Sequence, residues 1–151
     1  MELKTKERAL LRYFRNNARE ALTKISRKTG MPVSTIFDKL RKYEATIIQK
    51  HTSLLNFEEL GYRVRAQLFV KTLPENRRTL GAYLKEYPNV NTIYRINNGF
   101  DYLVEVVFHS VQELEGFVEE LELERGVKEK ELYFIIADVA REQFLARARP
   151  C

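Results

Sequence analysis

The residues best suited to chemistry lie between Thr23 and Tyr43, and they are suited to binding a polyanion. This stretch reads as two short helices joined by a tight turn at Gly30. The second helix has an apolar inner face, with one-turn spacing, and a polar outer face formed by Ser34, Thr35, Asp38, Lys39, Arg41 and Lys42. The pattern is typical of a helix-turn-helix whose second helix enters the major groove of double-stranded DNA.

Each outer-face side chain has a chemistry that suits nucleic acid. Ser34 and Thr35 fall in the first turn, where the positive end of the helix favours hydrogen bonds to phosphates and base edges. Asp38 has two interpretations: it accepts a hydrogen bond from a cytosine amino group, or it pairs with a basic neighbour on its own helix. The residues expected to neutralise phosphates are Lys39, Arg41 and Lys42. The alternative for the whole set is an ordinary solvated helix face.

The charge distribution favours the first interpretation. Residues 1–50 hold 13 Lys and Arg against 5 Asp and Glu, a net charge of +8. Residues 51–151 hold 13 basic and 16 acidic residues, a net charge of −3, and the whole chain carries +5. Because positive charge is concentrated around the helix-turn-helix, we expect phosphate binding in the first third of the chain and none in the rest.

The sequence offers little for other kinds of chemistry. Its single cysteine, Cys151, has no partner for a disulfide or a metal site, and the two histidines, His51 and His109, stand in no catalytic or ligand pattern. The glycines form no phosphate-binding loop. No apolar run is long enough for a membrane span, and the first residues are too charged for a signal peptide. We therefore expect no enzyme, no cofactor, no metal, no contact with a membrane, and a cytoplasmic location.

Three helices are expected in the first 50 residues, which would form a DNA-binding domain. Apolar spacing predicts them over residues 3–16, 22–29 and 32–45, with Gly30 ending the second and Pro32 starting the third. Residues 46–57 are rich in strand-forming residues and predict a short wing or a linking strand. Residues 51–60 would then serve as the hinge between two domains.

Residues 61–151 predict a second domain of alternating elements. Strands are expected over 63–71, 90–97, 101–109 and 128–138, and helices over 74–87 and from Ser110 to Gly126, with a short terminal helix over 139–148. Asn98-Gly99 is a strong signal for a hairpin turn. The order β-α-β-β-α-β predicts an α+β, ferredoxin-like antiparallel sheet with both helices on one face. Apolar residues at both parities of several strands predict that a second copy of the chain covers the open face.

The whole arrangement resembles the leucine-responsive regulatory protein/AsnC, or feast/famine, family of transcriptional regulators. Leu22 to Gly30 and Val33 to Glu44 are similar to its helix-turn-helix, and Ser53 to Asn56 to the strand that leaves it. Gly99-Phe100-Asp101-Tyr102-Leu103 resembles a recurring motif of its effector domain. The resemblance implies a DNA-binding regulator that forms homodimers or higher oligomers. It also implies an amino-acid-like effector at a subunit interface.

The residues expected at that effector site are Asn98, Gly99 and Asp101. Their other interpretation is purely structural, with a tight turn at Asn98-Gly99 and an acceptor at Asp101 that stabilises it. Two other functions stay open for the chain. Sirohaem decarboxylases are similar in architecture and would bind a tetrapyrrole, although the basic first third and the few histidines speak against them. An architectural DNA-binding protein that senses nothing would bind many sequences alike.

Overall fold

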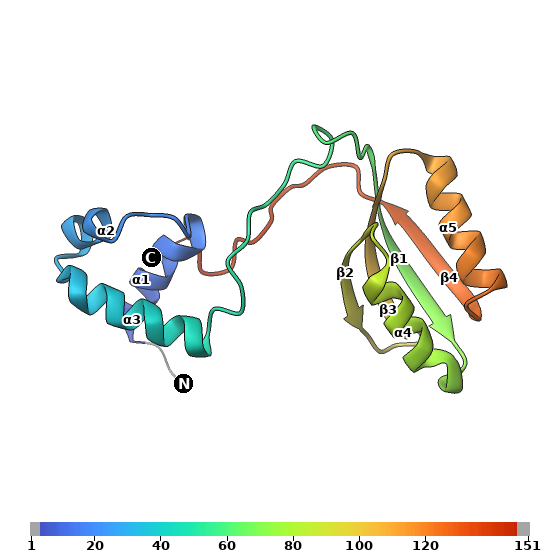
Figure 1. The fold of residues 1–151 in the computed structure, drawn as a ribbon, viewed down its shortest axis with the longest axis horizontal. Coiled ribbons are helices and arrows are strands. Elements are labelled where there is room, and N and C mark those ends of the chain that lie inside the picture. The colour runs from blue at the N-terminus through green and yellow to red at the C-terminus, as the bar shows by residue number, and fades with distance from the viewer. Residues whose placement is uncertain (1–3, 148–151) are drawn as a thin grey trace. The chain divides into compact units, whose positions relative to one another are not determined.

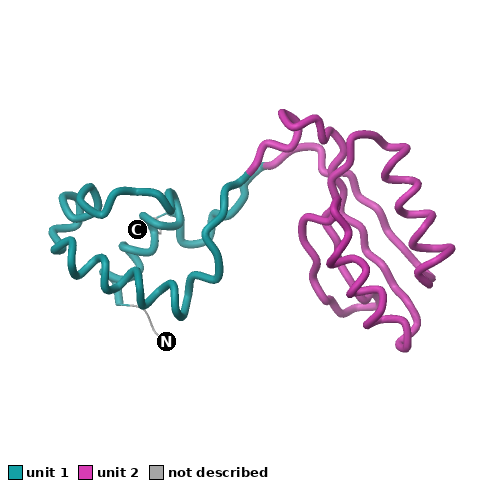
Figure 2. Tube along the Cα trace, in the orientation of Figure 1, with its two compact units in different colours: residues 1–54, 139–151 teal, residues 55–138 magenta. Residues whose placement is uncertain are grey.

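The computed structural model describes residues 4–147, which fall into two compact units (Figures 1 and 2). The first unit combines residues 1–54 with residues 139–151, and the second comprises residues 55–138. Leu3, in the first expected helix, and Cys151 lie outside the described residues. Among the helices that are described, none is long and apolar enough to cross a membrane.

The first unit is built on three helices, α1 (Thr5–Asn16), α2 (Leu22–Thr29) and α3 (Val33–Thr46). Their apolar faces meet in a small core of buried side chains: Leu10, Leu11, Phe14, Ile25, Ile36 and Tyr43. These positions follow the helical spacing that the sequence displays, so burial of this stripe accounts for the three-helix arrangement.

The turn between α2 and α3 is fixed by short-range hydrogen bonds. Gly30 adopts a left-handed conformation, with φ of 70°, and its N–H donates to Ser26 O at 2.8 Å. Ser26 Oγ donates to Met31 O at 2.6 Å, and Thr29 Oγ1 accepts from Met31 N at 3.3 Å. A left-handed residue with no Cβ ends a helix at little cost, and this sets where α3 begins.

The end of the chain returns to the first unit instead of forming the expected helix. No helix is present in the described residues 139–147, because Glu142 and Leu145 have φ of 54° and 61°, values that a right-handed helix does not allow. Arg15 donates to Phe144 O at 3.1 Å and forms an ion pair with Glu142. Asn16 Nδ2 donates a hydrogen bond to Ala146 O at 2.7 Å. These contacts group the tail with α1, whereas we expected it in the second domain.

The second unit has the expected order of elements and the expected α+β class. Its strands are β1 (Val64–Thr72), β2 (Val90–Arg95), β3 (Tyr102–Phe108) and β4 (Val127–Phe134); its helices are a short 3-10 turn η1 (Pro74–Asn76), α4 (Arg77–Glu86) and α5 (Val111–Leu123). All neighbouring strands pair antiparallel, in the order β2-β3-β1-β4. This is the ferredoxin-like arrangement, and its prediction is confirmed.

Helices α4 and α5 cover one face of this sheet (Figure 1). Their buried side chains, among them Leu84 and Phe117, pack on Ala66, Leu68 and Val104 of the strands. The opposite face carries an apolar group that we call the open-face patch, formed by Phe69, Tyr94, Phe100, Leu103 and Tyr133. Tyr94 and Tyr133 are 58% and 56% exposed, so none of the residues 4–147 covers this patch.

The segment between the units differs from its prediction. Residues 47–63 contain a turn over 57–61 but no strand, so neither a wing nor a linking strand is formed in this segment. A strand-forming sequence becomes a regular strand only when a neighbouring strand accepts its backbone hydrogen bonds, and the described residues supply none here.

Candidate nucleic-acid interface and effector loop

Helix α3 presents most of the predicted DNA-binding residues to solvent on one side. Ile36 is fully buried, and this orients the helix so that its outer face is exposed. The exposed members of the predicted set are Ser34, Thr35, Asp38, Arg41 and Lys42. Pro32 precedes the helix and provides no side-chain cap, so the first N–H groups of α3 have no hydrogen bond from a capping side chain. This end can therefore donate to an anion.

Lys39 differs from the other five predicted residues. Its ammonium group is half-buried and lies 3.0 Å from Glu7 Oε1 of α1, in an ion pair that joins α3 to α1. This hydrogen bond raises the pKa of Lys39 and lowers that of Glu7. Lys39 lies three residues after Ile36, at the edge of the inner face, and so points toward α1. The structure gives it a partner within the protein, so we expect Lys39 to contribute less to phosphate binding than Arg41 and Lys42 do.

Asp38, Arg41 and Lys42, the other charged residues of the predicted set, are exposed and available for an external partner. Within the described residues, Asp38 forms no ion pair with Arg41 or Lys42, which leaves its carboxylate free to accept from a base. Arg41 lies over the ring of Phe37, with 5.9 Å between the guanidinium carbon and the ring centroid. Phe37 is itself 48% exposed on the same side of α3. The helix therefore offers hydrogen-bonding, charged and apolar groups together, as base reading requires.

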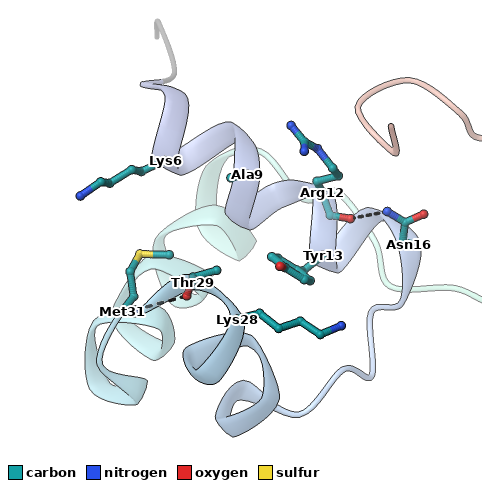
Figure 3. A pocket seen from close by; sticks show the side chains of 8 residues that line it. All are labelled: Lys6, Ala9, Arg12, Tyr13, Asn16, Lys28, Thr29 and Met31. Atoms are coloured by element: carbon teal, nitrogen blue, oxygen red, sulfur yellow. Dashed lines mark hydrogen bonds between the residues drawn. The ribbon is translucent and has the colours of Figure 1, made fainter. Parts of the chain in front are cut away.

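A second basic surface lies on α1 and the end of α2 (Figure 3). It is a cleft of about 370 Å³ that contains three cations and no carboxylate; its lining residues are Lys6, Ala9, Arg12, Tyr13, Asn16, Lys28, Thr29 and Met31. Lys28 lies over the ring of Tyr13 at 5.8 Å. None of the lining residues belongs to α3. The cleft adds to the positive potential of the first unit, whose residues 1–54 and 139–151 hold 16 basic and 6 acidic residues.

The predicted effector residues lie on the connection between β2 and β3, and they divide into two groups. Asn98 and Gly99 form the turn, with φ of 64° and 94°, as the sequence predicts for a tight hairpin. Asp101 is buried, with 5% of its surface exposed. Its carboxylate accepts hydrogen bonds from Thr72 N at 2.9 Å, Arg77 Nε at 2.8 Å and Arg95 Nη1 at 3.0 Å. Asp101 therefore fastens the loop to β1 and α4, and its carboxylate is occupied by the protein itself.

Two opposing influences act on the pKa of Asp101. Burial raises the pKa, but the Thr72 N–H, the hydrogen bond from Arg77 and the charges of Arg77 and Arg95 together outweigh it and hold the pKa below its ordinary value. Asp101 is therefore ionised at neutral pH and neutralises part of the charge on two arginines. Both guanidinium groups remain partly exposed beside the loop.

Sequence reasoning does not reveal three features near these sites. Nothing in the sequence distinguishes Phe37, because a lone aromatic residue in an amphipathic helix is usually part of the core. Arg77 lies 24 residues before Asp101, so no local spacing connects the two, whereas Arg95 lies only six residues before Asp101 and its place just ahead of the turn does suggest a role at this loop. The contacts of the tail with α1 span about 130 residues and leave no signal in the sequence.

The sequence profile of the Lrp/AsnC ligand binding domain matches residues 65–144, more than half of the chain. The chain belongs to the Lrp/AsnC family. The predicted resemblance is thereby confirmed, and with it the expectation of no enzyme, since this family and the relatives below are described as regulators.

Several curated relatives are similar over most of their length. The HTH-type transcriptional regulator FL11 of Pyrococcus horikoshii is 27% identical over 114 residues, which cover 75% of this chain and 76% of the relative. The transcriptional regulator AzlB of Bacillus subtilis is 26% identical over 116 residues, 74% of each chain. An uncharacterised HTH-type regulator of Pyrococcus furiosus is 26% identical over 145 residues, which cover 95% of this chain and 97% of the relative.

Solved structures of Lrp/AsnC regulators share the fold. The Neisseria meningitidis regulator NMB0573 in complex with L-Met superimposes with a TM-score of 0.85 at 20% identity, covering 93% of this chain and 94% of that one. Bacillus subtilis LrpC gives 0.84 at 17% identity, covering 93% and 99%. At these identities the comparison shows a shared fold alone and leaves the ligand of this chain to other arguments.

Proposed function

We propose that this protein is a transcriptional regulator that binds double-stranded DNA in the cytoplasm through helix α3. The observation that carries the proposal is the outer face of α3, where Ser34, Asp38 and Arg41 are exposed together on the more basic unit. Positive potential draws the first unit to phosphates, while the exposed polar groups on one helix face read base edges. The chain's curated relatives are HTH-type regulators, which supports the same function.

The second unit joins two copies of the chain through the open-face patch. Exposed aromatic side chains such as Tyr133 and Tyr94 are common at interfaces between proteins, and a second sheet of the same kind would cover them. Dimerisation places two copies of α3 about one turn of DNA apart, so the site is expected to be pseudo-palindromic. Assembly beyond the dimer is compatible with this arrangement.

The loop between β2 and β3 is the proposed effector site. Asn98 and Gly99 expose backbone groups at the turn, and Asp101 holds the loop in shape from beneath. The ligand we propose is an amino-acid-like small molecule, because two structural neighbours carry L-methionine. Regulation of DNA binding by this ligand requires that the ligand bind one arrangement of the oligomer more tightly than another.

The test compares two variants that each remove positive charge from the same helix. Arg41→Ala combined with Lys42→Ala should weaken DNA binding and reduce the dependence of log K on log salt by about one for each phosphate that is no longer neutralised. Lys39→Ala is the matched control: it removes a cation that already pairs with Glu7, so the salt dependence should stay as in the wild type. Equal effects of both variants would refute α3 as the reading helix.

A non-sensing architectural role is the second candidate, and the cleft on α1 and α2 favours it. Three cations lie there, away from α3, and would bind phosphates without regard to sequence. In that case the wild-type protein would bind every DNA fragment alike, and Lys6→Ala with Lys28→Ala would weaken binding to all of them. A sequence-specific regulator would prefer its own site over other DNA, and this preference would survive in the same variant although its affinity for all DNA falls.

A further inference from the structure

Helix α3 carries one aromatic side chain that the proposed function does not yet use. Phe37 is 48% exposed, whereas Ile36 and Tyr43 of the same helix are buried in the core of the unit. It follows Ser34 by three residues and precedes Arg41 by four, so all three share one side of the helix. The ring lies among polar and charged groups on the side of the helix that we expect to meet DNA. Binding would bury the ring, and an apolar group of the DNA is the partner that would stabilise it there.

The major groove offers one apolar group that a side chain can read, the 5-methyl group of thymine. We infer that Phe37 packs against a thymine methyl and so determines part of the sequence preference of this protein. The inference rests on the proposed binding of DNA by α3. Charge supports this occupant over a second protein chain, because Arg41 lies against the ring, on the unit that holds 16 basic and 6 acidic residues.

The contact of Arg41 with Phe37 strengthens the inference. The guanidinium carbon lies 5.9 Å from the ring centroid. The ring therefore supports one side of the Arg41 guanidinium group and leaves the other side of that group open to a partner. A supported arginine loses less conformational freedom when it binds a phosphate or a guanine. Phe37 would thus contribute apolar contact directly and orient a charged neighbour.

Replacing thymine by deoxyuridine removes the methyl group and leaves every hydrogen-bonding atom in place, so it isolates this contact. The DNA probes are duplexes enriched by the wild-type protein from a random pool, resynthesised with each thymine replaced in turn, and measured at about 0.15 M salt. At the contacted position the wild type should lose about fourfold in affinity per half-site, the effect of one buried methyl group. Phe37→Ala should bind the thymine and deoxyuridine duplexes equally at that position.

Phe144→Ala is the matched control, because Phe144 is an 80% exposed phenylalanine of the same unit that lies outside α3. It should retain the fourfold preference for thymine. Phe37→Leu keeps an apolar contact and should retain part of the preference, which guards against a folding defect in Phe37→Ala.

Two outcomes would overturn the inference. The first is a wild-type protein that binds specific DNA but is indifferent to deoxyuridine at every position; the proposed function then stands, and the role of Phe37 is refuted. The second is a Phe37→Ala protein that keeps the full preference for thymine. If the sedimentation mass of that variant also changes, the ring is assigned to contact between chains. Failure of every variant and the wild type to bind DNA would instead refute the proposed function.

Discussion

The buried carboxylate of Asp101 gives a sharp prediction about the effector loop. In Asp101→Ala, the N–H of Thr72 is left without its partner; Thr72 is 5% exposed, so that water cannot easily replace the missing bond. An unsatisfied buried donor costs about 1–3 kcal/mol. Arg77 and Arg95 also lose a charged partner, but their side chains are 39% and 47% exposed and are rehydrated, so they add less. We expect the second unit to lose about 3 kcal/mol of unfolding free energy.

The assay is urea unfolding followed by circular dichroism, with Glu129→Ala as the matched control. Glu129 pairs with Lys71 on the open side of the same sheet but is 62% exposed, so its loss should leave the urea midpoint unchanged. For Asp101→Ala the midpoint should fall by about 1.5 M if the slope is about 2 kcal/mol per molar urea.

The pH dependence of this effect follows from the lowered pKa of Asp101. A carboxyl whose pKa is lower in the folded state stabilises the fold above its unfolded pKa of about 3.9, and this contribution disappears as the pH falls through the folded value. The difference between wild type and Asp101→Ala should therefore be full at neutral pH and shrink below about pH 4. A difference under about 0.5 kcal/mol at neutral pH, or one independent of pH, would refute the role assigned to Asp101.

Two further predictions concern surfaces of the two units. Tyr133→Asp places a charge in the open-face patch, and we expect it to shift the protein from dimer to monomer in analytical ultracentrifugation, whereas an unchanged dimer would remove this patch from the interface. A chain that ends at Asp138 loses the hydrogen bonds from Arg15 and Asn16 to the tail. Its first unit should be destabilised by about 1–2 kcal/mol and its DNA affinity reduced, while its oligomeric state is kept; unaltered thermal unfolding of that unit would contradict the structural role of the tail.

The sequence predicted those elements whose signals are local. Gly30 and Asn98-Gly99 take the left-handed conformations that their residue types favour. Ser110 begins α5 as expected, since its Oγ accepts from Glu113 N at 3.2 Å. Alternating apolar residues then fix which side of each strand packs on the helices, so that the order and class of elements could be read correctly.

Features that depend on distant partners could not be predicted in the same way. Lys39 and Arg41 are both basic residues of one helix, and only the position of Glu7 on another helix separates their roles. Likewise, the carboxylate of Asp101 turns inward because Thr72 and Arg77 lie beneath the loop. The expected helix over 139–148 is absent from the described residues 139–147 for a related reason. The residue types there favour a helix, but the segment that contacts α1 has backbone angles that a right-handed helix does not allow.

The central claim is that helix α3 reads DNA sequence. Its most direct test is the affinity of the wild-type protein for the DNA upstream of its own gene and for a shuffled fragment of equal length, measured over a series of salt concentrations. We expect affinity for both fragments to fall as salt rises, with a preference for the upstream DNA that survives at about 0.15 M salt. Equal affinity for both fragments at every salt concentration would contradict sequence reading by α3.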